Sequence, residues 1–228
     1  MNSNGNGFHP WWWPSKWKRT PRSEEDLAPY QRLALQLHYD LPRSEDARSA
    51  LLVTPSASNL CARGSVLLST CLAEQLRRPI LLIDVCPKNP EASRLMECTE
   101  GRGFADFLSN PNLPLDELVI QTTCENVYFL PSGKDPASSL PVAPETIGKL
   151  MKAAERKFDF VLLSGDSVLT DPLSLALAPC VGCVLLLVIE NETRVEDLDA
   201  AHNALGYCKA RKVGMLLTKP IRSGVWSL

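Results

Sequence analysis

Residues 50–84 read ALLVTPSASNLCARGSVLLSTCLAEQLRRPILLID and contain two short apolar runs, Ala50–Thr54 and Ile80–Asp84. Both runs have the length of a strand and are continuously apolar, as strands are when helices cover both faces of a sheet. The pattern between them, approximately Ser65–Gln75, favours a helix. The stretch therefore predicts two parallel strands joined by a crossover helix.

The same alternation of strand and helix patterns continues through the chain. Further strand-sized runs are Val127–Leu130, Phe160–Leu163, Cys183–Ile189 and Val213–Thr218. Helical patterns are Leu27–Asp40, which would pack on the domain or on a partner, Glu91–Glu97, Ala143–Lys157 and Val195–Ala210. The predicted fold class is α/β, a doubly wound and mostly parallel sheet, with any ligand at the carboxyl ends of the strands. Those ends are Pro55–Ala57, Asp84–Lys88, Pro131–Gly133, Ser164–Ser167 and Glu190–Thr193.

Length and composition indicate one globular domain with short appendages. The chain has 228 residues, of which 45% are hydrophobic and 22% charged, close to an average soluble domain. We expect a basic, tryptophan-rich tail over residues 1–26, an α/β domain over residues 27–220, and a short tail over residues 221–228. The longest uncharged apolar run, Leu173–Ile189, contains Pro179 and Gly182, so no membrane span is predicted. Without an apolar leader, a cytoplasmic location is expected.

Charge is distributed unevenly along the sequence. The overall net charge is −2, but residues 1–22 carry four basic residues and no acid, which leaves −6 for the remainder. An acidic body argues against a nucleic-acid-binding domain, which needs a dominant basic face. Most of the eight cysteines lie in apolar runs, so we expect reduced, buried thiols and no metal site.

The N-terminal tail is a candidate interaction segment. Its aromatic and basic residues are interleaved: Trp11, Trp12, Trp13, Lys16, Trp17, Lys18 and Arg19. The segment is too short to form a core of its own, so tryptophans at this density indicate a contact elsewhere. They would lie at the interface of an anionic membrane or dock on a membrane partner, or else fold back over an apolar groove of the domain.

Several short motifs occur in a specific order. They are Ala50-Leu-Leu-Val-Thr54, Leu81-Leu-Ile-Asp84 with Pro90, Gly103-Phe-Ala-Asp-Phe-Leu108, Tyr128-Phe-Leu-Pro-Ser-Gly133, Phe158-Asp-Phe-Val-Leu-Leu163, Thr170-Asp171 and Thr193-Arg194. In this order the chain resembles the cytoplasmic P-loop tyrosine kinases of bacterial capsule and exopolysaccharide systems, of the CpsD/CapB and Wzc type, which are relatives of the MinD/ParA ATPases. The resemblance covers about residues 27–219.

The resemblance implies a phosphate loop at Ala62-Arg63-Gly64-Ser65-Val66. In such loops, glycine amides and a helix N-terminus cradle the phosphates, a lysine contacts them, and a hydroxyl holds Mg²⁺. Only Gly64 matches this pattern, because Ala62 replaces the first glycine, Ser65 the lysine and Val66 the hydroxyl. Arg63 is the only cation in the loop.

The acidic motifs of the resembled family are also incomplete. Asp84 matches the first aspartate of the second-strand motif, but the second position is Cys86. In the fourth-strand motif, Ser164 stands where an aspartate is expected, and Asp166 follows two residues later. Phosphoryl transfer depends on positioning and charge compensation, so these losses should abolish it. For Asp84 and Asp171 the favoured interpretation is structural, as capping or helix N-terminal residues.

The prediction is a catalytically degenerate, kinase-like subunit that regulates or scaffolds exopolysaccharide assembly or export, and no cofactor is assigned to it. Implied partners are the cytoplasmic end of a membrane chain-length protein (polysaccharide co-polymerase) or a related kinase, at the inner face of the membrane. The alternative is an active ATP- and Mg²⁺-dependent tyrosine kinase or ATPase using Arg63, Asp84 and Asp166, and a third possibility is a MinD/ParA-like positioning ATPase. The family's ring contact, E-x-x-R-x-x-R, is not expected, because Ala28, Gln31 and Ala34 occupy its charged positions.

Overall fold

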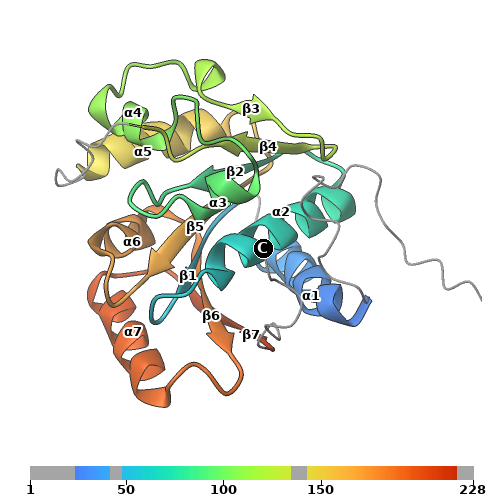
Figure 1. The fold of residues 1–228 in the computed structure, drawn as a ribbon, viewed down its shortest axis with the longest axis vertical. Coiled ribbons are helices and arrows are strands. Elements are labelled where there is room, and N and C mark those ends of the chain that lie inside the picture. The colour runs from blue at the N-terminus through green and yellow to red at the C-terminus, as the bar shows by residue number, and fades with distance from the viewer. Residues whose placement is uncertain (1–23, 42–47, 135–142, 220–228) are drawn as a thin grey trace, which may run out of the picture.

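The computed structural model describes residues 24–41, 48–134 and 143–219, which form a seven-stranded sheet covered by helices on both faces (Figure 1). The strand order is β3-β4-β2-β5-β1-β6-β7, and every neighbouring pair is parallel except β3 with β4. The strands are β1 Ser49–Thr54, β2 Ile80–Asp84, β3 Ile120–Gln121, β4 Val127–Leu130, β5 Phe160–Ser167, β6 Cys183–Ile189 and β7 Val213–Thr218. The helices are α1 Glu24–Asp40, α2 Leu60–Leu76, α3 Glu91–Leu95, α4 Phe104–Ser109, α5 Pro144–Glu155, α6 Pro172–Leu177 and α7 Val195–Tyr207, with short 3₁₀ turns at Leu115–Glu117 and Ala178–Cys180. The predicted α/β class with a doubly wound, mostly parallel sheet is confirmed.

The core consists of two apolar layers, one on each face of the sheet. Successive residues of the central strands point alternately into the two layers, so that Leu52 and Leu82 pack under α1 and α2, while Leu51 and Ile83 face the side of α5 and α7. Both faces are buried, which explains why these strands are continuously apolar in the sequence rather than alternating.

Helix α1 packs on its own domain rather than remaining available to a partner. Tyr30, Leu33 and Ala34 are buried against the α2 side of the core, and Gln75 of α2 donates a hydrogen bond of 2.9 Å from its side-chain amide to the carbonyl oxygen of Gln31. Of the two options that the sequence left open for this helix, the structure therefore selects packing on the domain.

Two elements differ from the sequence-based boundaries in a way that affects the carboxyl edge of the sheet. Helix α2 begins at Leu60, five residues before the predicted start at Ser65. Strand β5 continues past Leu163 to Ser167, where it pairs with Thr54 across a register shift in β1. This extension requires Gly165, because a Cβ there would lie 2.7 Å from Cγ1 of Val53. The longer strand carries Asp166 to the carboxyl edge of the sheet.

The sequence motifs Gly103–Leu108 and Tyr128–Gly133 meet where the start of α4 contacts the end of β4. The amide of Phe104 donates to the carbonyl of Pro131 at 2.8 Å, and the amide of Ala105 donates to the carbonyl of Ser132 at 2.9 Å. Gly103 lies against this backbone, and its amide donates to a carboxylate oxygen of Asp106 at 2.8 Å. The start of α4 is thus fixed by main-chain hydrogen bonds to the end of a core strand.

The proposed interaction segment lies outside the described residues. This applies to Trp11, Trp12, Trp13 and Trp17, to Lys16, Lys18 and Arg19, and to residues 221–228. The first helix begins at Glu24, within the stretch predicted as tail. No described helix combines the length and apolarity that crossing a membrane requires.

Candidate functional site

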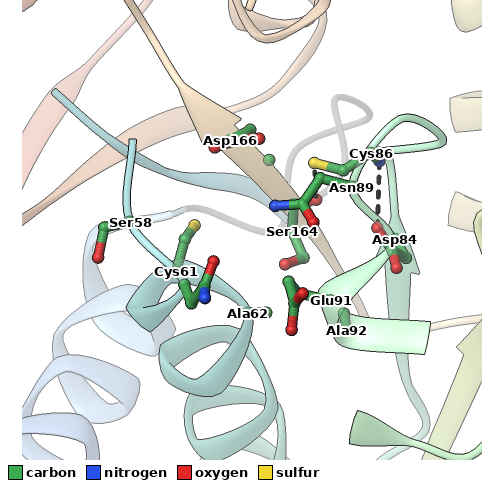
Figure 2. Close-up of a pocket in the computed structure, with 12 residues that line it drawn as sticks. Ser58, Cys61, Ala62, Asp84, Cys86, Asn89, Glu91, Ala92, Ser164 and Asp166 are labelled. Carbon is green, nitrogen blue, oxygen red and sulfur yellow. Dashed lines mark hydrogen bonds between the residues drawn. The ribbon is translucent and has the colours of Figure 1, made fainter. Parts of the chain in front are cut away.

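A small pocket lies at the carboxyl ends of β1, β2 and β5, between the beginnings of α2 and α3 (Figure 2). It is lined by Ser58, Asn59, Cys61, Ala62, Asp84, Cys86, Asn89, Glu91, Ala92, Ser164, Gly165 and Asp166. The volume open to the centre of a water molecule is about 10 Å³, which corresponds to about one water. Three of the lining residues carry carboxyl groups, and none carries a positively charged side chain.

Asp84 is almost fully buried, and both of its carboxylate oxygens accept hydrogen bonds from the protein. Oδ1 accepts from the amide of Cys86 at 3.1 Å, the bond drawn in Figure 2. Oδ2 accepts from the amide of Ser93 at 2.8 Å and from its hydroxyl at 2.7 Å. The hydroxyl oxygen of Ser93 in turn accepts from the amide of Ser132 at 3.0 Å. Asp84 therefore connects the end of β2 to α3 and, through Ser93, to the end of β4.

The environment of Asp84 raises the pKa of its carboxyl group. Burial raises the pKa of its carboxyl from the ordinary 3.8 to about 6, although the hydrogen bonds from Ser93 and Cys86 act in the opposite direction, and the charge of Glu91 raises it further. The neighbouring thiol of Cys86 also has a pKa well above its usual value, first because of burial and second because of Asp84. Cys86 is therefore a neutral thiol.

The first turn of α2 differs from a phosphate-binding loop. The amide of Leu60 at its beginning donates to the hydroxyl oxygen of Ser58 at 3.2 Å, so a side chain of the chain itself occupies that donor. The thiol of Cys61 donates to the carbonyl of Leu52 at 3.1 Å, and burial raises its pKa. The helix N-terminus thus presents a neutral thiol and the methyl group of Ala62 toward the pocket.

Of the residues that the resemblance assigned to the phosphate loop, only some lie at the pocket. Ala62 lines the pocket, whereas Gly64, Ser65 and Val66 lie further along α2 and do not. A Cβ on Gly64 would lie 3.2 Å from Cδ2 of Leu52, and the hydroxyl of Ser65 donates to the carbonyl of Cys61 at 3.0 Å. These three residues serve the packing of the helix against the sheet.

Arg63 lies in the same turn of α2 but is not among the lining residues. Its guanidinium is half-buried, and this burial lowers its pKa, while the charge of Glu91 acts in the opposite direction. Arg63, the cationic residue of α2, therefore interacts electrostatically with Glu91, which lines the pocket.

Asp166 and Asp171 follow the apolar part of β5 and have different roles. The carboxylate of Asp166 lines the pocket and accepts a hydrogen bond of 2.8 Å from the amide of Ser167. Asp171 lies outside the lining and caps α6, accepting hydrogen bonds from the amides of Leu173 and Ser174 at 3.3 and 3.0 Å. Its position therefore has a local structural explanation.

Several pocket residues were not singled out from the sequence. Ser58 and Asn89 lie one residue beyond the predicted strand ends Pro55–Ala57 and Asp84–Lys88, and Glu91 opens the following helix. Cys61 was treated only as a buried thiol. Their signal was proximity to a strand end in a parallel sheet, which locates a site to within a few residues but does not identify its members.

Comparison with solved structures shows the same fold in bacterial tyrosine kinase domains. The kinase domain of the Escherichia coli tyrosine kinase ETK is 16% identical, with a TM-score of 0.72, over 89% of this chain and 78% of that one. The VpsO kinase domain is also 16% identical, with a TM-score of 0.73, over 86% of this chain and 95% of that one. The cell division protein MinD of Aquifex aeolicus is 14% identical, with a TM-score of 0.59, over 79% and 75% of the two chains.

No protein-family model matches the sequence, and no curated protein is similar to it at a significant level. The similarity is therefore one of structure at low identity, and it extends to a ParA family ATPase from Chlorobium tepidum. The chain has the α/β fold that these tyrosine kinase domains share with the MinD and ParA ATPases.

Proposed function

We propose that this chain is a kinase-like protein that acts by binding, as a regulatory or scaffolding subunit of exopolysaccharide or capsule assembly, and not by phosphoryl transfer. The observation that carries the proposal is the composition of the pocket, which holds Asp84, Glu91 and Asp166 and no cationic side chain among its lining residues. Its assignment to polysaccharide assembly rests on the resemblance of the sequence motifs to the CpsD/CapB and Wzc-type kinases.

Charge is the physical basis of the proposal. The phosphates of ATP need positive charge and amide donors from the protein, and the transition state needs them more. Here the carboxylates of Glu91 and Asp166 would repel them. The first donor of α2 is occupied by Ser58, and Asp84 uses both oxygens to hold α3 and the Cys86 backbone. A pocket with room for about one water would also have to open widely.

The partner we propose is the cytoplasmic end of a membrane chain-length protein, or a related kinase, with the chain located at the inner face of the membrane. The tryptophan-rich tail over residues 1–26 would make this contact, next to the α/β domain over residues 27–220 and a C-terminal tail over residues 221–228. Support comes from the sequence of the tail, in which four tryptophans lie close to Lys16, Lys18 and Arg19.

One observation favours the alternative of an active enzyme. The charge of Glu91, a pocket residue, raises the pKa of Arg63 against the effect of burial, so this cation interacts electrostatically with the pocket. Rotation of this side chain toward a bound phosphate, with Asp84 or Asp166 holding Mg²⁺, would give an unorthodox kinase or ATPase site. This possibility defines the test.

We expect the purified full-length chain to show no Mg²⁺-dependent ATP hydrolysis or tyrosine phosphorylation above background, and Asp166→Asn to change nothing, because the pocket lacks charge compensation for the transferred phosphoryl group. Turnover would be followed by phosphate release and by anti-phosphotyrosine detection, with added chain-length protein as a second condition. Turnover that requires Mg²⁺ and is lost in both Arg63→Gln and Asp166→Asn would establish the alternative. Capture of the chain-length protein that is lost on deletion of residues 1–22 would support the binding role.

A further inference from the structure

Basic side chains gather at the amino edge of the sheet, opposite the pocket. Six parallel strands begin at this edge. Among the described residues within four positions before each of these strands, the acids are Glu125 and Asp159, and the basic residues are Arg48, Arg77, Arg78, Arg156, Lys157, Lys209, Arg211 and Lys212. Glu45 and Asp46 also precede β1 but lie outside the described residues. We call these eight basic residues the basic edge.

Most of the basic edge is exposed. Every member except the half-buried Arg48 is open to solvent. Lys157 forms an ion pair with Asp116, and the ammonium of Lys212 donates to the carbonyl of Asp40 at 3.1 Å. The remaining exposed members include four that form no ion pair with another described residue: Arg77, Arg78, Arg156 and Lys209. Their charge is available to a partner.

Two exposed aromatic rings accompany these charges. Tyr39 is the last residue but one of α1, and its exposure is 78%. The carbonyl of Asp40, which ends the helix, accepts a hydrogen bond from Lys212 before β7. Tyr207 is the last residue of α7, two positions before Lys209, and its exposure is 88%. Tyrosine rings with neighbouring basic side chains suit the headgroup region of a membrane, where both kinds of side chain gain.

The helix macrodipole explains only part of the pattern. Basic residues are favoured at helix C-termini, which accounts for Arg77 after α2 and Arg156 after α5. Two further members contact the end of α1: Lys212 donates to the carbonyl of Asp40, its last residue, and Arg48 lies 3.1 Å from Nδ1 of His38 in its last turn. These local contacts do not explain why basic residues outnumber acids by eight to two among the described residues that precede the parallel strands.

We propose that the basic edge is a docking surface for an anionic lipid bilayer, which would hold the molecule with its pocket facing away from the membrane. The charges come from the separate loops before β2, β5, β1 and β7, which span five neighbouring strands, a width of about 19 Å at the usual spacing of about 4.8 Å between strands. They form a row across the end of the sheet, and the acidic pocket opens at the other end. A row of this kind matches a flat charged surface better than it matches a nucleic-acid strand, which favours a groove with stacked bases. The proposal goes beyond the proposed function and does not depend on it.

The test is co-sedimentation of the full-length chain with vesicles of phosphatidylglycerol and phosphatidylcholine, and with phosphatidylcholine alone. The edge variant is Arg77→Gln/Arg78→Gln/Lys209→Gln. The matched control, Lys88→Gln/Arg194→Gln/Lys219→Gln, removes the same charge from exposed side chains at the carboxyl edge. Both proteins keep the N-terminal tail. Thermal melting checks that both variants are folded. If the edge variant is not folded, the milder variant Arg156→Gln/Lys209→Gln replaces it.

We expect the edge variant to bind the anionic vesicles on the order of 100-fold more weakly than the unaltered chain, because each basic residue near such a surface contributes a factor of about 5. The control variant should bind the anionic vesicles like the unaltered chain. None of the three proteins should bind vesicles of phosphatidylcholine alone, and added salt should weaken binding to the anionic vesicles. Equal binding by all three proteins would overturn the proposal and assign any membrane affinity to the tail. Binding to single- or double-stranded DNA that exceeds lipid binding and is lost in the edge variant would also overturn it.

Discussion

Replacement of Gly103 by alanine is expected to lower the free energy of unfolding by about 3 kcal/mol or more, and the midpoint of thermal unfolding by about 10 °C. The cause is steric. A Cβ at this position would overlap the carbonyl oxygen of Pro131 and lie 2.6 Å from the amide nitrogen of Gly133. Both atoms belong to backbone, and relief by movement would weaken the hydrogen bond from the Phe104 amide to Pro131. Chemical denaturation monitored by circular dichroism measures the effect.

Two other glycines provide controls for this prediction. A Cβ on Gly101, two residues away, would meet no atom within 4 Å, and the same is true of Gly148 within α5. Gly101→Ala should be close to neutral, and Gly148→Ala should be neutral or stabilising, because alanine is the better helix former. If Gly103→Ala is as stable as Gly101→Ala, then α4 is not held against β4 in the manner described.

The second prediction concerns the pH dependence of stability and isolates Asp84. The folded state holds the Asp84 proton more tightly than the unfolded chain does, with a pKa of about 6 against 3.8. Stability from this proton is therefore fully present below about pH 4 and is lost as the pH rises through about 6. Asp84→Asn does not titrate at this position. Relative to that variant, the unaltered chain should lose about 3 kcal/mol of unfolding free energy as the pH rises from about 4 to about 7.

Denaturation of both proteins at several pH values from acidic to neutral gives this difference directly, since contributions from other carboxylates cancel. The variant Ser93→Ala adds a check on direction. It removes the hydroxyl that stabilises the Asp84 carboxylate, so the pKa of Asp84 should rise and the loss of stability should move to higher pH. A constant difference between the unaltered chain and Asp84→Asn at all pH values would show that burial does not perturb this carboxyl group.

Much of the fold could be predicted from the sequence, because the central strands are buried on both faces and therefore appear as continuous apolar runs. The runs Ile80–Asp84, Val127–Leu130, Cys183–Ile189 and Val213–Thr218 coincide with strands of the structure. Strand β3 gave no such signal, since its two residues are exposed at the sheet edge. The start of α2 was missed although Ser58 and Asn59, directly before Leu60, are residue types favoured at helix N-caps and could have marked the position.

The candidate site was predictable in place but not in detail. The rule that ligand sites lie at the carboxyl ends of parallel strands located Asp84, Cys86, Ser164 and Asp166, and all four line the pocket. The sequence does not reveal that Ser93, nine residues after Asp84, supplies two of its hydrogen bonds. That contact depends on how α3 folds back over the end of β2. Spacing along the chain cannot report a hydrogen bond made through tertiary structure.

The central claim is that the pocket no longer accepts a nucleotide, and titration of the full-length chain with a fluorescent ATP analogue, with and without Mg²⁺, tests it most directly. With three carboxylates and no cationic side chain lining a space for about one water, we predict no saturable binding up to millimolar nucleotide. Micromolar, magnesium-dependent binding that is weakened by Arg63→Gln would contradict the account and point to an active or nucleotide-switched protein.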